Sequence, residues 1–439
     1  EMGRWTVTKR KTLKTLALAL SISLLAPFAS KVHATEKVNT PEIISKAGVV
    51  VDYDTGEVIY DKNGNEKMYL ASTTKLMTAL LFAENAKKTD QIVYTETALA
   101  QPPYTMQSEQ MLPYGKSFKV GDTIDADTAM KELLLFSGND AAYMIAEHVG
   151  GTSEKFIQMM NDKAKELGLI NTHFENPNGL PDSVTGKDVN YSTAYELSIL
   201  TKKAYENEWI RETMALSNAT VTLPGDTIIH LENRNTELGK NGNIGGKTGV
   251  TNDAGTCFAG LYERNGRKLI GVVLKSDRND NDARFRDLNS MMDYSYPAEK
   301  QVIKKAGDEV GSLELEYKLF GFFGPTKTIT ANVTLSEDLK LYNNSLNVNN
   351  LKITLNPESN NAWKLASKND IPLSATVLDS ALEVKGSSDL TVFKLIKANM
   401  FVYIAIVLAI VIVVILVVLI IKIINNRKRY SRSRRRRRY

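Results

Sequence analysis

The chain contains very little cysteine and histidine. Its 439 residues include one cysteine, Cys257, and four histidines. A single cysteine excludes an intramolecular disulfide and any zinc or iron–sulfur centre built from cysteines. His148, His173 and His230 are too scattered along the sequence for a zinc site, and the H-E-x-x-H pattern of metallopeptidases is absent. We therefore expect no metal ion and no cofactor.

Proline and glycine are also scarce, at 12 and 27 residues, while 43% of the residues are hydrophobic. This composition excludes low-complexity disorder for the bulk of the chain, because there is ample apolar material to build a core. The length allows about two or three folded units. The sequence shows no internal repeat.

Acidic residues are scarce at both ends, which makes the net charge of +5 misleading. Residues 1–34 hold six Lys or Arg and one Glu, and residues 400–439 hold ten Lys or Arg and no acid. The intervening part is left with 39 basic and 49 acidic residues. Because this main body is acidic, its charge does not favour nucleic-acid binding.

The first 34 residues have the pattern of a secretory signal peptide. Five basic residues between positions 4 and 14 precede sixteen uncharged residues, 15–30. Val32 and Ala34 then supply small residues at positions −3 and −1 of a cleavage site. The alternative is an uncleaved anchor helix, which is disfavoured because the apolar run is short and Pro27 interrupts it near its end.

The C-terminal part instead predicts a transmembrane helix. Residues 400–421 are 22 consecutive uncharged residues, enough for about 33 Å of helix against a hydrocarbon core of about 30 Å. The basic residues of 422–439 predict a cytoplasmic tail, because positive clusters beside a span stay inside. The tail could instead bind nucleic acid, but contact with anionic lipid is favoured beside a span. The two ends together predict a protein of the cell membrane whose main body lies on the outer face.

The pattern between the ends predicts an α+β fold. Strand patterns occur early and late, and the last two are joined by the hairpin signal Asn265-Gly266. They cover residues 47–51, 58–60, 245–250, 256–262 and 268–275. Helical patterns fill the middle, at residues 72–84, 128–136, 140–148, 153–167 and 192–205. This order predicts one antiparallel sheet with a cluster of helices. After about residue 298, short alternating runs predict a small all-β domain over 298–388.

Three short motifs could carry chemistry. In the first, Ser72 and Lys75 lie three residues apart at the start of a predicted helix, hence on one face. A lysine whose pKa is lowered by burial and nearby cations can take the proton of a serine. The other two are Ser137-Gly138-Asn139, in a break between helical patterns, and Lys247-Thr248-Gly249, on a predicted strand. Each is common alone, but the three in this order point to one active site.

The order S-x-x-K, S-x-N, K-T-G resembles that of the low-molecular-mass penicillin-binding proteins, which are serine-type D-alanyl-D-alanine carboxypeptidases. Further blocks that look like this family lie at residues 70–79, 167–174, 176–182 and 269–274. The resemblance covers residues 42–296 strongly. It implies a β-lactamase/DD-peptidase-like catalytic domain, followed by a family-like C-terminal β domain. It also implies that the substrate is a peptidoglycan stem peptide and that β-lactam antibiotics acylate the protein.

The resemblance implies roles for the first two motifs. Ser72 would form an acyl-enzyme with the penultimate D-Ala of the stem peptide, and Lys75 would take its proton. Ser137 would pass a proton to the leaving D-Ala, and Asn139 would hold the substrate amide. These four residues form the expected catalytic set.

The resemblance assigns substrate binding to Lys247, Thr248, Gly249 and Val250. Lys247 and Thr248 would bind the terminal carboxylate, while the backbone N–H groups of Ser72 and Val250 would form the oxyanion hole. Val250 stands where some relatives have histidine, which matters little if only its N–H is used. Asn190 stands where histidine is common, so it is given no role.

Three other functions fit less well. A class A β-lactamase would need an acid in an E-x-x-L-N motif, but Asn171 comes one position late after Glu166, which falls in a predicted helix. A transpeptidase or endopeptidase would differ only in the acceptor that the groove admits. A catalytically dead wall-binding protein is disfavoured by the complete motif set. Cys257, on the strand behind the site, is interpreted as a small buried hydrophobic residue.

Overall fold

The computed structural model describes residues 40–101 and 119–436. The chain divides into a unit of residues 1–42 and a second unit of residues 43–439, and the second contains everything below. The predicted signal peptide, residues 1–34, lies outside the described residues.

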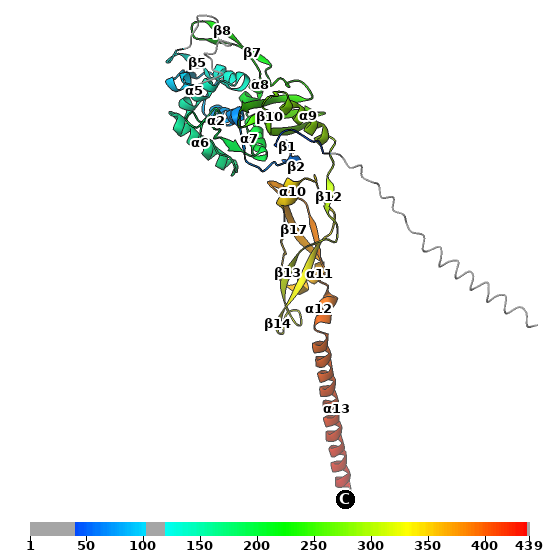
Figure 1. Ribbon diagram of the computed structural model, residues 1–439. Coiled ribbons are helices and arrows are strands. Elements are labelled where there is room, and N and C mark those ends of the chain that lie inside the picture. The colour runs from blue at the N-terminus through cyan, green and yellow to red at the C-terminus, as the bar shows by residue number, and fades with distance from the viewer. Residues whose placement is uncertain (1–39, 102–118, 437–439) are drawn as a thin grey trace, which may run out of the picture. The chain divides into compact units, whose positions relative to one another are not determined.

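A five-stranded antiparallel sheet forms the centre of the first part of this unit (Figure 1). Its strand order is β2-β1-β11-β10-β9. The strands are β1 (Ala47–Asp52), β2 (Val58–Lys62), β9 (Asn243–Thr251), β10 (Gly255–Arg264) and β11 (Arg267–Ser276). The predicted hairpin is confirmed, since Asn265 and Gly266, both at positive φ, join β10 to β11. Strands from the two ends of the domain therefore meet in one sheet, with β1 paired to β11.

Both faces of the sheet are buried, which explains the continuous apolar run of β1. Val49 and Val51 belong to the core shared with the helical cluster, while Val50 points into a second core. In that second core α9 (Ala283–Ser295) packs on β11 so closely that a Cβ on Gly271 would lie 2.3 Å from Leu288. Sheets covered on both faces lack the alternation of half-exposed strands.

The helical cluster lies on the other face (Figure 1). It contains η1 (Ala71–Thr74), α2 (Lys75–Asn85), α3 (Glu96–Leu99), α4 (Ala126–Lys131), η2 (Glu132–Phe136), α5 (Asn139–Gly150), α6 (Ser153–Glu166), α7 (Ala194–Glu206) and α8 (Glu208–Met214). Three two-stranded sheets border it: β3 (Met68–Tyr69) with β6 (Tyr191–Ser192), β4 (Gln91–Val93) with β5 (Thr123–Asp125), and β7 (Asn218–Leu223) with β8 (Thr227–Glu232). The arrangement confirms the predicted α+β class. The predicted helices are present, whereas α8, α9 and the β7–β8 hairpin were not predicted.

The region after residue 298 is β-rich but not all-β, which corrects the prediction. Its strands are β12 (Gln301–Lys304), β13 (Glu309–Lys318), β14 (Thr326–Leu335), β15 (Leu339–Leu341), β16 (Leu351–Leu355), β17 (Asp370–Val377), β18 (Ser380–Leu382) and β19 (Lys385–Ser388). Two short helices interrupt them, α10 (Ser345–Asn350) and α11 (Ala362–Lys368), and a third, α12 (Val392–Ala398), follows the last strand. Leu390 and Leu395 are buried in the core of this region, so its packing continues past residue 388.

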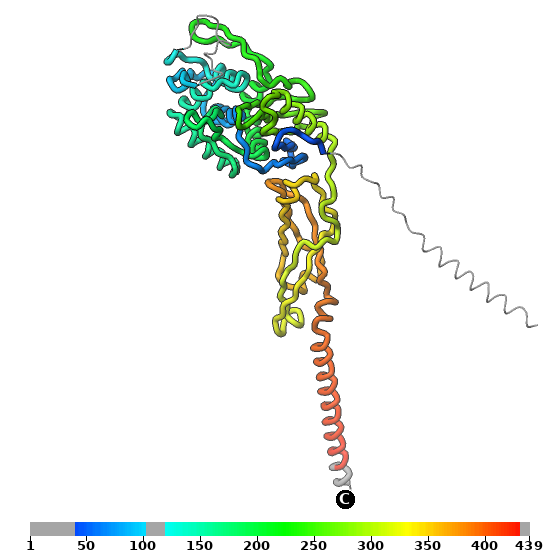
Figure 2. Tube along the Cα trace, viewed as in Figure 1, coloured from blue at the N-terminus to red at the C-terminus, as the bar shows by residue number. Residues whose placement is uncertain are grey.

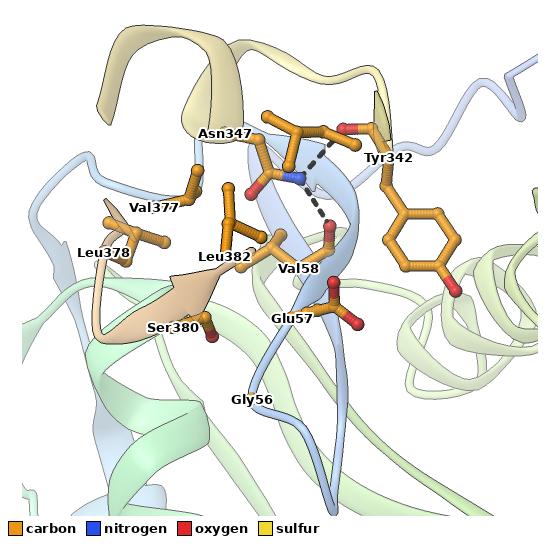
Figure 3. Close-up of a pocket in the computed structure, with 10 residues that line it drawn as sticks. Gly56, Glu57, Val58, Tyr342, Asn347, Val377, Leu378, Ser380 and Leu382 are labelled. Carbon is orange, nitrogen blue, oxygen red and sulfur yellow. Dashed lines mark hydrogen bonds between the residues drawn. The ribbon is translucent and has the colours of Figure 1, made fainter. Parts of the chain in front are cut away.

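Side chains of α10 and the residues before it contact the edge of the central sheet (Figure 3). Asn347 donates from Nδ2 to the carbonyl oxygens of Val58 and Tyr342, both at 2.8 Å. Asn344 also donates to Val58 O, at 3.0 Å. The exposed carbonyl of edge strand β2 is thereby paired, which reduces the tendency of an open sheet edge to bind another chain.

The last element, α13, runs from Met400 to Arg436 and follows α12 along the chain (Figure 2). The most apolar 18-residue window within its segment Met400–Tyr430 has a mean hydropathy of 4.0 and is 0% buried. A soluble core helix would bury such a surface. The helix is long and apolar enough to cross a membrane, as predicted for residues 400–421.

Candidate active site

Ser72 and Lys75 lie where the chain passes from a tight turn into α2. Ala71 adopts a left-handed φ of 47°, and η1 then leads into α2 at Lys75. Spacing of three residues in such a turn places both side chains on one side. The Nζ of Lys75 lies 2.9 Å from the Oγ of Ser72, so the two functional groups are in hydrogen-bond contact.

Lys75 is fully buried, at 0% exposure. Its Nζ also donates to Asn139 Oδ1 and to the backbone oxygen of Asn178, both at 2.8 Å. The pKa of Lys75 is lowered well below the usual lysine value, chiefly because burial disfavours the charged form and next because Arg234 is nearby. Asp140 acts in the opposite direction. A lysine of this kind can lose its proton and act as a base.

Ser137 is held at a break between helices. The π-helical turn η2 ends at Ser137, which has a left-handed φ of 67°, and α5 begins two residues later at Asn139. The carbonyl of Glu132 accepts the N–H of Gly138 at 2.9 Å and closes this turn. Single π-turns inside helices are frequent at functional sites. Here the turn directs Ser137 towards Lys247 and Asn139 towards Lys75.

Lys247, Thr248, Gly249 and Val250 lie on β9, the edge strand of the central sheet. The Nζ of buried Lys247 donates to Ser137 Oγ and to Thr248 O, both at 2.9 Å. The pKa of Lys247 is lowered well below its usual value by burial first, then by the charges of Lys75, Arg234 and Arg284. The third motif is thus in direct contact with the second.

Gly249 brings β9 against the turn that carries Ser72. A Cβ at position 249 would lie 3.0 Å from both Leu70 O and Ser72 N, so a side chain there would require these backbone atoms to shift. Glycine permits this approach because it has no Cβ. The structure therefore brings all eight predicted site residues into one region, from η1, the start of α2, the turn before α5, the first residue of α5, and β9.

Three contributions to this region were not predicted. Asn178 supplies a backbone oxygen to Lys75, and backbone contacts leave no residue-type pattern in a sequence. Arg234 donates from Nε to Phe136 O, and Arg284 donates from Nη1 to Gly249 O at 3.1 Å. Both arginines lie near the lysines closely enough to lower the pKa of Lys247.

The surroundings of Cys257 and Glu166 do not favour a catalytic role for either residue. Cys257 is fully buried on β10, and burial raises the pKa of its thiol to about 11, which confirms the interpretation as a packed, unreactive side chain. Glu166 ends α6, forms an ion pair with Lys163 at 2.9 Å and is 64% exposed. It is therefore not placed as the buried water-activating acid that a class A β-lactamase requires.

A serine hydroxyl in contact with a buried lysine of lowered pKa is the arrangement of a serine acyl-transfer enzyme with a lysine base. The D-alanyl-D-alanine carboxypeptidase family, peptidase family S11, matches residues 34–278, more than half of the chain. The chain belongs to this D-alanyl-D-alanine carboxypeptidase family, which confirms the predicted family and fold.

Individual relatives agree with this assignment. The D-alanyl-D-alanine carboxypeptidase DacF of Bacillus subtilis (strain 168) is 28% identical over 288 residues, covering 65% of this chain and 71% of the relative. A mutant of the Streptomyces K15 DD-transpeptidase matches with a TM-score of 0.52 and 28% identity, over 59% of this chain and 100% of that one. Penicillin-binding protein D2 of Listeria monocytogenes, in a cefotaxime-bound form, matches with a TM-score of 0.50 and 29% identity, over 59% and 99%.

Proposed function

We propose that this protein removes the terminal D-alanine from peptidoglycan stem pentapeptides through an acyl-enzyme on Ser72. Family membership supplies the reaction, serine-type D-Ala-D-Ala carboxypeptidase. One observation supports the residue assignment most: the 2.9 Å contact between Lys75 Nζ and Ser72 Oγ, made by a fully buried lysine of lowered pKa. A serine hydroxyl is a weak nucleophile until a base removes its proton.

In the acylation step, Ser72 Oγ attacks the carbonyl carbon of the penultimate D-Ala while Lys75 Nζ takes the hydroxyl proton. The developing oxyanion is bound by the backbone N–H groups of Ser72 and Val250. The close approach of Gly249 to Ser72 N supports this part of the proposal, because it puts β9 beside the nucleophile.

The C–N bond of the tetrahedral intermediate then breaks, and the D-Ala amine leaves with a proton delivered through Ser137. Lys247 and Thr248 hold the terminal carboxylate of the departing residue, and Asn139 holds the substrate amide. The proton that Ser137 delivers is the one that Lys75 took from Ser72, and the hydrogen bond from Lys247 supports the placement of Ser137 as its relay. Water then attacks the ester on Ser72 while Lys75, neutral again, takes a proton from the water and passes it to Ser72 Oγ as the peptide acid leaves.

A β-lactam has the same reactive amide and an anionic group beside it, so it would acylate Ser72 by the same attack. Its amine stays tethered to the acyl group after the ring opens. The cefotaxime-bound relative supports this extension to the present chain.

We place the catalytic domain, residues 42–296, and the β-rich domain after it outside the cell membrane. The exposed apolar helix α13 supports anchoring, and the basic residues that follow residue 421 support a cytoplasmic tail. The secretory pattern of residues 1–34 supports export of the catalytic domain.

The full-length protein in detergent tests the residue assignment. Wild type should release D-alanine from a pentapeptide and be labelled by fluorescent penicillin, whereas Ser72→Ala should do neither. Lys75→Ala and Lys75→Arg should both fold, with acylation slowed about 10²–10⁴-fold, because general-base contributions are of this size. Acylation of Lys75→Ala within about tenfold of wild type would contradict a lysine base.

The same assay separates hydrolysis from transpeptidation. An amine acceptor is added, and the products are analysed by mass spectrometry for the free tetrapeptide and for its amide with the acceptor. Free tetrapeptide as the main product supports a carboxypeptidase. A dominant acceptor adduct would instead assign a transpeptidase activity, the activity for which the Streptomyces K15 relative is named.

A further inference from the structure

The turn between β13 and β14, residues 319–325, presents phenylalanine side chains to the surroundings. Phe322 is 84% exposed and Phe323 is 52% exposed, while Phe320 stacks on Phe323 with ring centroids 4.8 Å apart. The backbone is closed by hydrogen bonds from Leu319 N–H to Pro325 O and from Phe320 N–H to Phe323 O, each 3.1 Å. The phenylalanine rings are therefore exposed on a turn whose backbone is held by hydrogen bonds.

This turn, which we call the aromatic turn, is attached to the beginning of α13. The hydroxyl of Tyr403 donates to Leu319 O at 2.6 Å, and its ring packs edge-on against Phe320. One residue before α13, Asn399 donates to Tyr317 OH and accepts from Lys327 Nζ, both at 2.7 Å. The end of the β13–β14 hairpin and the first turn of the apolar helix are therefore joined.

This attachment fixes the depth of the aromatic turn if α13 crosses a bilayer. Tyr403 lies three residues after Met400, which is about 4.5 Å along the helix axis. The headgroup region on each side of a bilayer is roughly 5–7 Å thick. A turn bonded to Tyr403 therefore lies at the membrane–water interface, where aromatic side chains are enriched.

Exposure and charge agree with this placement. Among the described residues, the phenylalanines that are more than half exposed all belong to the aromatic turn, to α12 or to the start of α13: Phe322, Phe323, Phe393 and Phe401. Residues 317–336 and 390–439 contain no Asp or Glu, but Lys318, Lys327 and Lys397 lie in them. Exposed apolar clusters of this kind mark interaction surfaces, and lysines beside them suit anionic lipid.

An apolar groove runs beside the aromatic turn. It is lined by Leu319, Phe320, Gly321, Trp363, Ile396 and Tyr403. The Nε1 of Trp363 donates to Lys318 O at 2.7 Å, so the polar edge of the indole is paired while the side chain lines the groove. Lipid acyl chains and headgroups offer the matching apolar and polar surfaces.

We propose that the aromatic turn inserts into the outer interface of the bilayer that α13 crosses, as a second membrane contact of the β-rich region. The proposal rests on the proposed membrane anchoring by α13. A single helix lets a domain rotate about its axis, whereas a second contact to one side of the helix fixes the domain's tilt. The partner is a phospholipid surface, and not another protein, because the turn is already bonded to the residues that enter the bilayer.

Site-directed fluorescence on the full-length chain tests the proposal. An environment-sensitive fluorophore is attached to single cysteines in a Cys257→Ala background, and the protein is reconstituted into phosphatidylcholine–phosphatidylglycerol vesicles. The positions are Phe322→Cys in the aromatic turn, Ile412→Cys in α13 and Glu337→Cys, an exposed position on the loop after β14. Position 322 should show a blue shift and quenching by lipids with a spin label near the headgroup, and position 337 should show neither.

The label at position 412 separates failure of the proposal from failure of the anchoring. If position 412 is quenched by deep spin labels but position 322 behaves like position 337, α13 spans the membrane and the proposal is overturned. If position 412 is not quenched, the anchoring is wrong and the proposal falls with it. If the label at position 322 is shielded from water without lipid, and Phe322→Cys forms disulfide-linked dimers, the aromatic turn binds a second copy of the chain. That result would also overturn the proposal.

Tyr403→Phe keeps the ring and removes the bond to Leu319, so it should reduce quenching at position 322 and leave quenching at position 412 unchanged.

Discussion

Lys247 donates a 2.9 Å hydrogen bond from Nζ to the Oγ of Ser137, although the two residues are 110 positions apart in the chain. Lys75 and Ser72 form a second pair at the same distance. Both lysines are buried, and burial is the largest cause of the lowered pKa of each. Because the charge of Lys75 also lowers the pKa of Lys247, the site disfavours two protonated lysines at once. The site therefore favours at least one neutral lysine, and a neutral Lys75 could accept the proton of Ser72.

Arg234 should set the pH dependence of acylation. After burial, its charge is the main factor that lowers the pKa of Lys75. Arg234→Gln should raise that pKa, so the acid limb of the pH profile for penicillin acylation should move to higher pH. Arg234→Lys keeps the charge and should leave the limb near its wild-type position. A uniform loss of rate at all pH values in Arg234→Gln would indicate only a structural role through the bond to Phe136.

Gly249→Ala should impair acylation more than it impairs stability. The new Cβ would lie 3.0 Å from Leu70 O and Ser72 N, and a shift of these backbone atoms would move Ser72, the proposed nucleophile. We expect acylation to slow about 10²-fold, because small displacements of reacting groups have effects of this size. The measurements are acylation rate and thermal midpoint.

Gly266→Ala is the matched control for this substitution. Its Cβ would have no atom within 4 Å, but Gly266 has a φ of 78°, so alanine is strained there. We expect a loss of about 1 kcal/mol of stability with acylation unchanged. The steric interpretation of position 249 is wrong if both variants lose stability equally and acylate alike.

The sequence predicted the central sheet well because its strands and the Asn265-Gly266 turn are specified locally. It missed α9, although Phe285, Leu288 and Met292 have helical spacing, because the polar residues between them obscure the pattern. The helices of the β-rich region were missed for another reason. Each spans only six or seven residues, which is too short for a periodic pattern to be recognised.

The sequence indicated that the three motifs belong to one candidate site, and they do lie together, but the groups that tune the two lysines could not be predicted. Arg234 reaches Phe136 from 98 residues away, and Arg284 reaches Gly249 from 35 residues away. Such contacts arise only when the chain is folded, so no local pattern specifies them. The burial of Glu132 near Asp140 could not be predicted either. The helical pattern around Glu132 contains lysine and leucine, and it does not indicate that this carboxyl group is buried.

Glu132→Gln should stabilise the protein increasingly as the pH rises. The carboxyl group of Glu132 is fully buried and makes no hydrogen bond with any residue that the structure describes. Its pKa is raised well above the usual value, first by burial and then by Asp140. The folded state thus holds this proton more tightly than the unfolded state. Stability is therefore lost as the pH rises from the unfolded pKa towards the raised folded pKa.

Glutamine cannot ionise, so the variant lacks this loss. Thermal midpoints of Glu132→Gln and wild type should be similar near pH 4, and the variant should be a few degrees more stable at neutral pH. Glu314→Gln, at an exposed position, is the control and should show no pH-dependent difference. A wild-type advantage that grows with pH would mean that Glu132 is ionised and paired in the native protein.

Truncation after Asn399 should remove the membrane anchor α13 and leave the catalytic domain and the β-rich region folded. Leu390 and Leu395 are buried in the core of the β-rich region, and the side chain of Asn399 bonds Tyr317. A chain ending after Asn399 should therefore be soluble and retain carboxypeptidase activity on small peptides. A chain ending after Ser388 loses both buried leucines, which costs about 2–5 kcal/mol for each, so its β-rich region should unfold at a lower temperature.

The orientation of the intact protein can be tested in cells. The basic residues after residue 421 should keep the C-terminal tail in the cytoplasm, and the catalytic domain should then lie outside. Protease added to intact cells should digest the catalytic domain and leave an epitope tag fused after Tyr439 protected. Permeabilised cells are the control, in which the tag should also be digested. Digestion of the tag in intact cells would show that the C-terminal tail lies outside, which is opposite to the proposed orientation. Because a catalytic domain in the cytoplasm could not reach crosslinked peptidoglycan, that result would also contradict the proposed substrate.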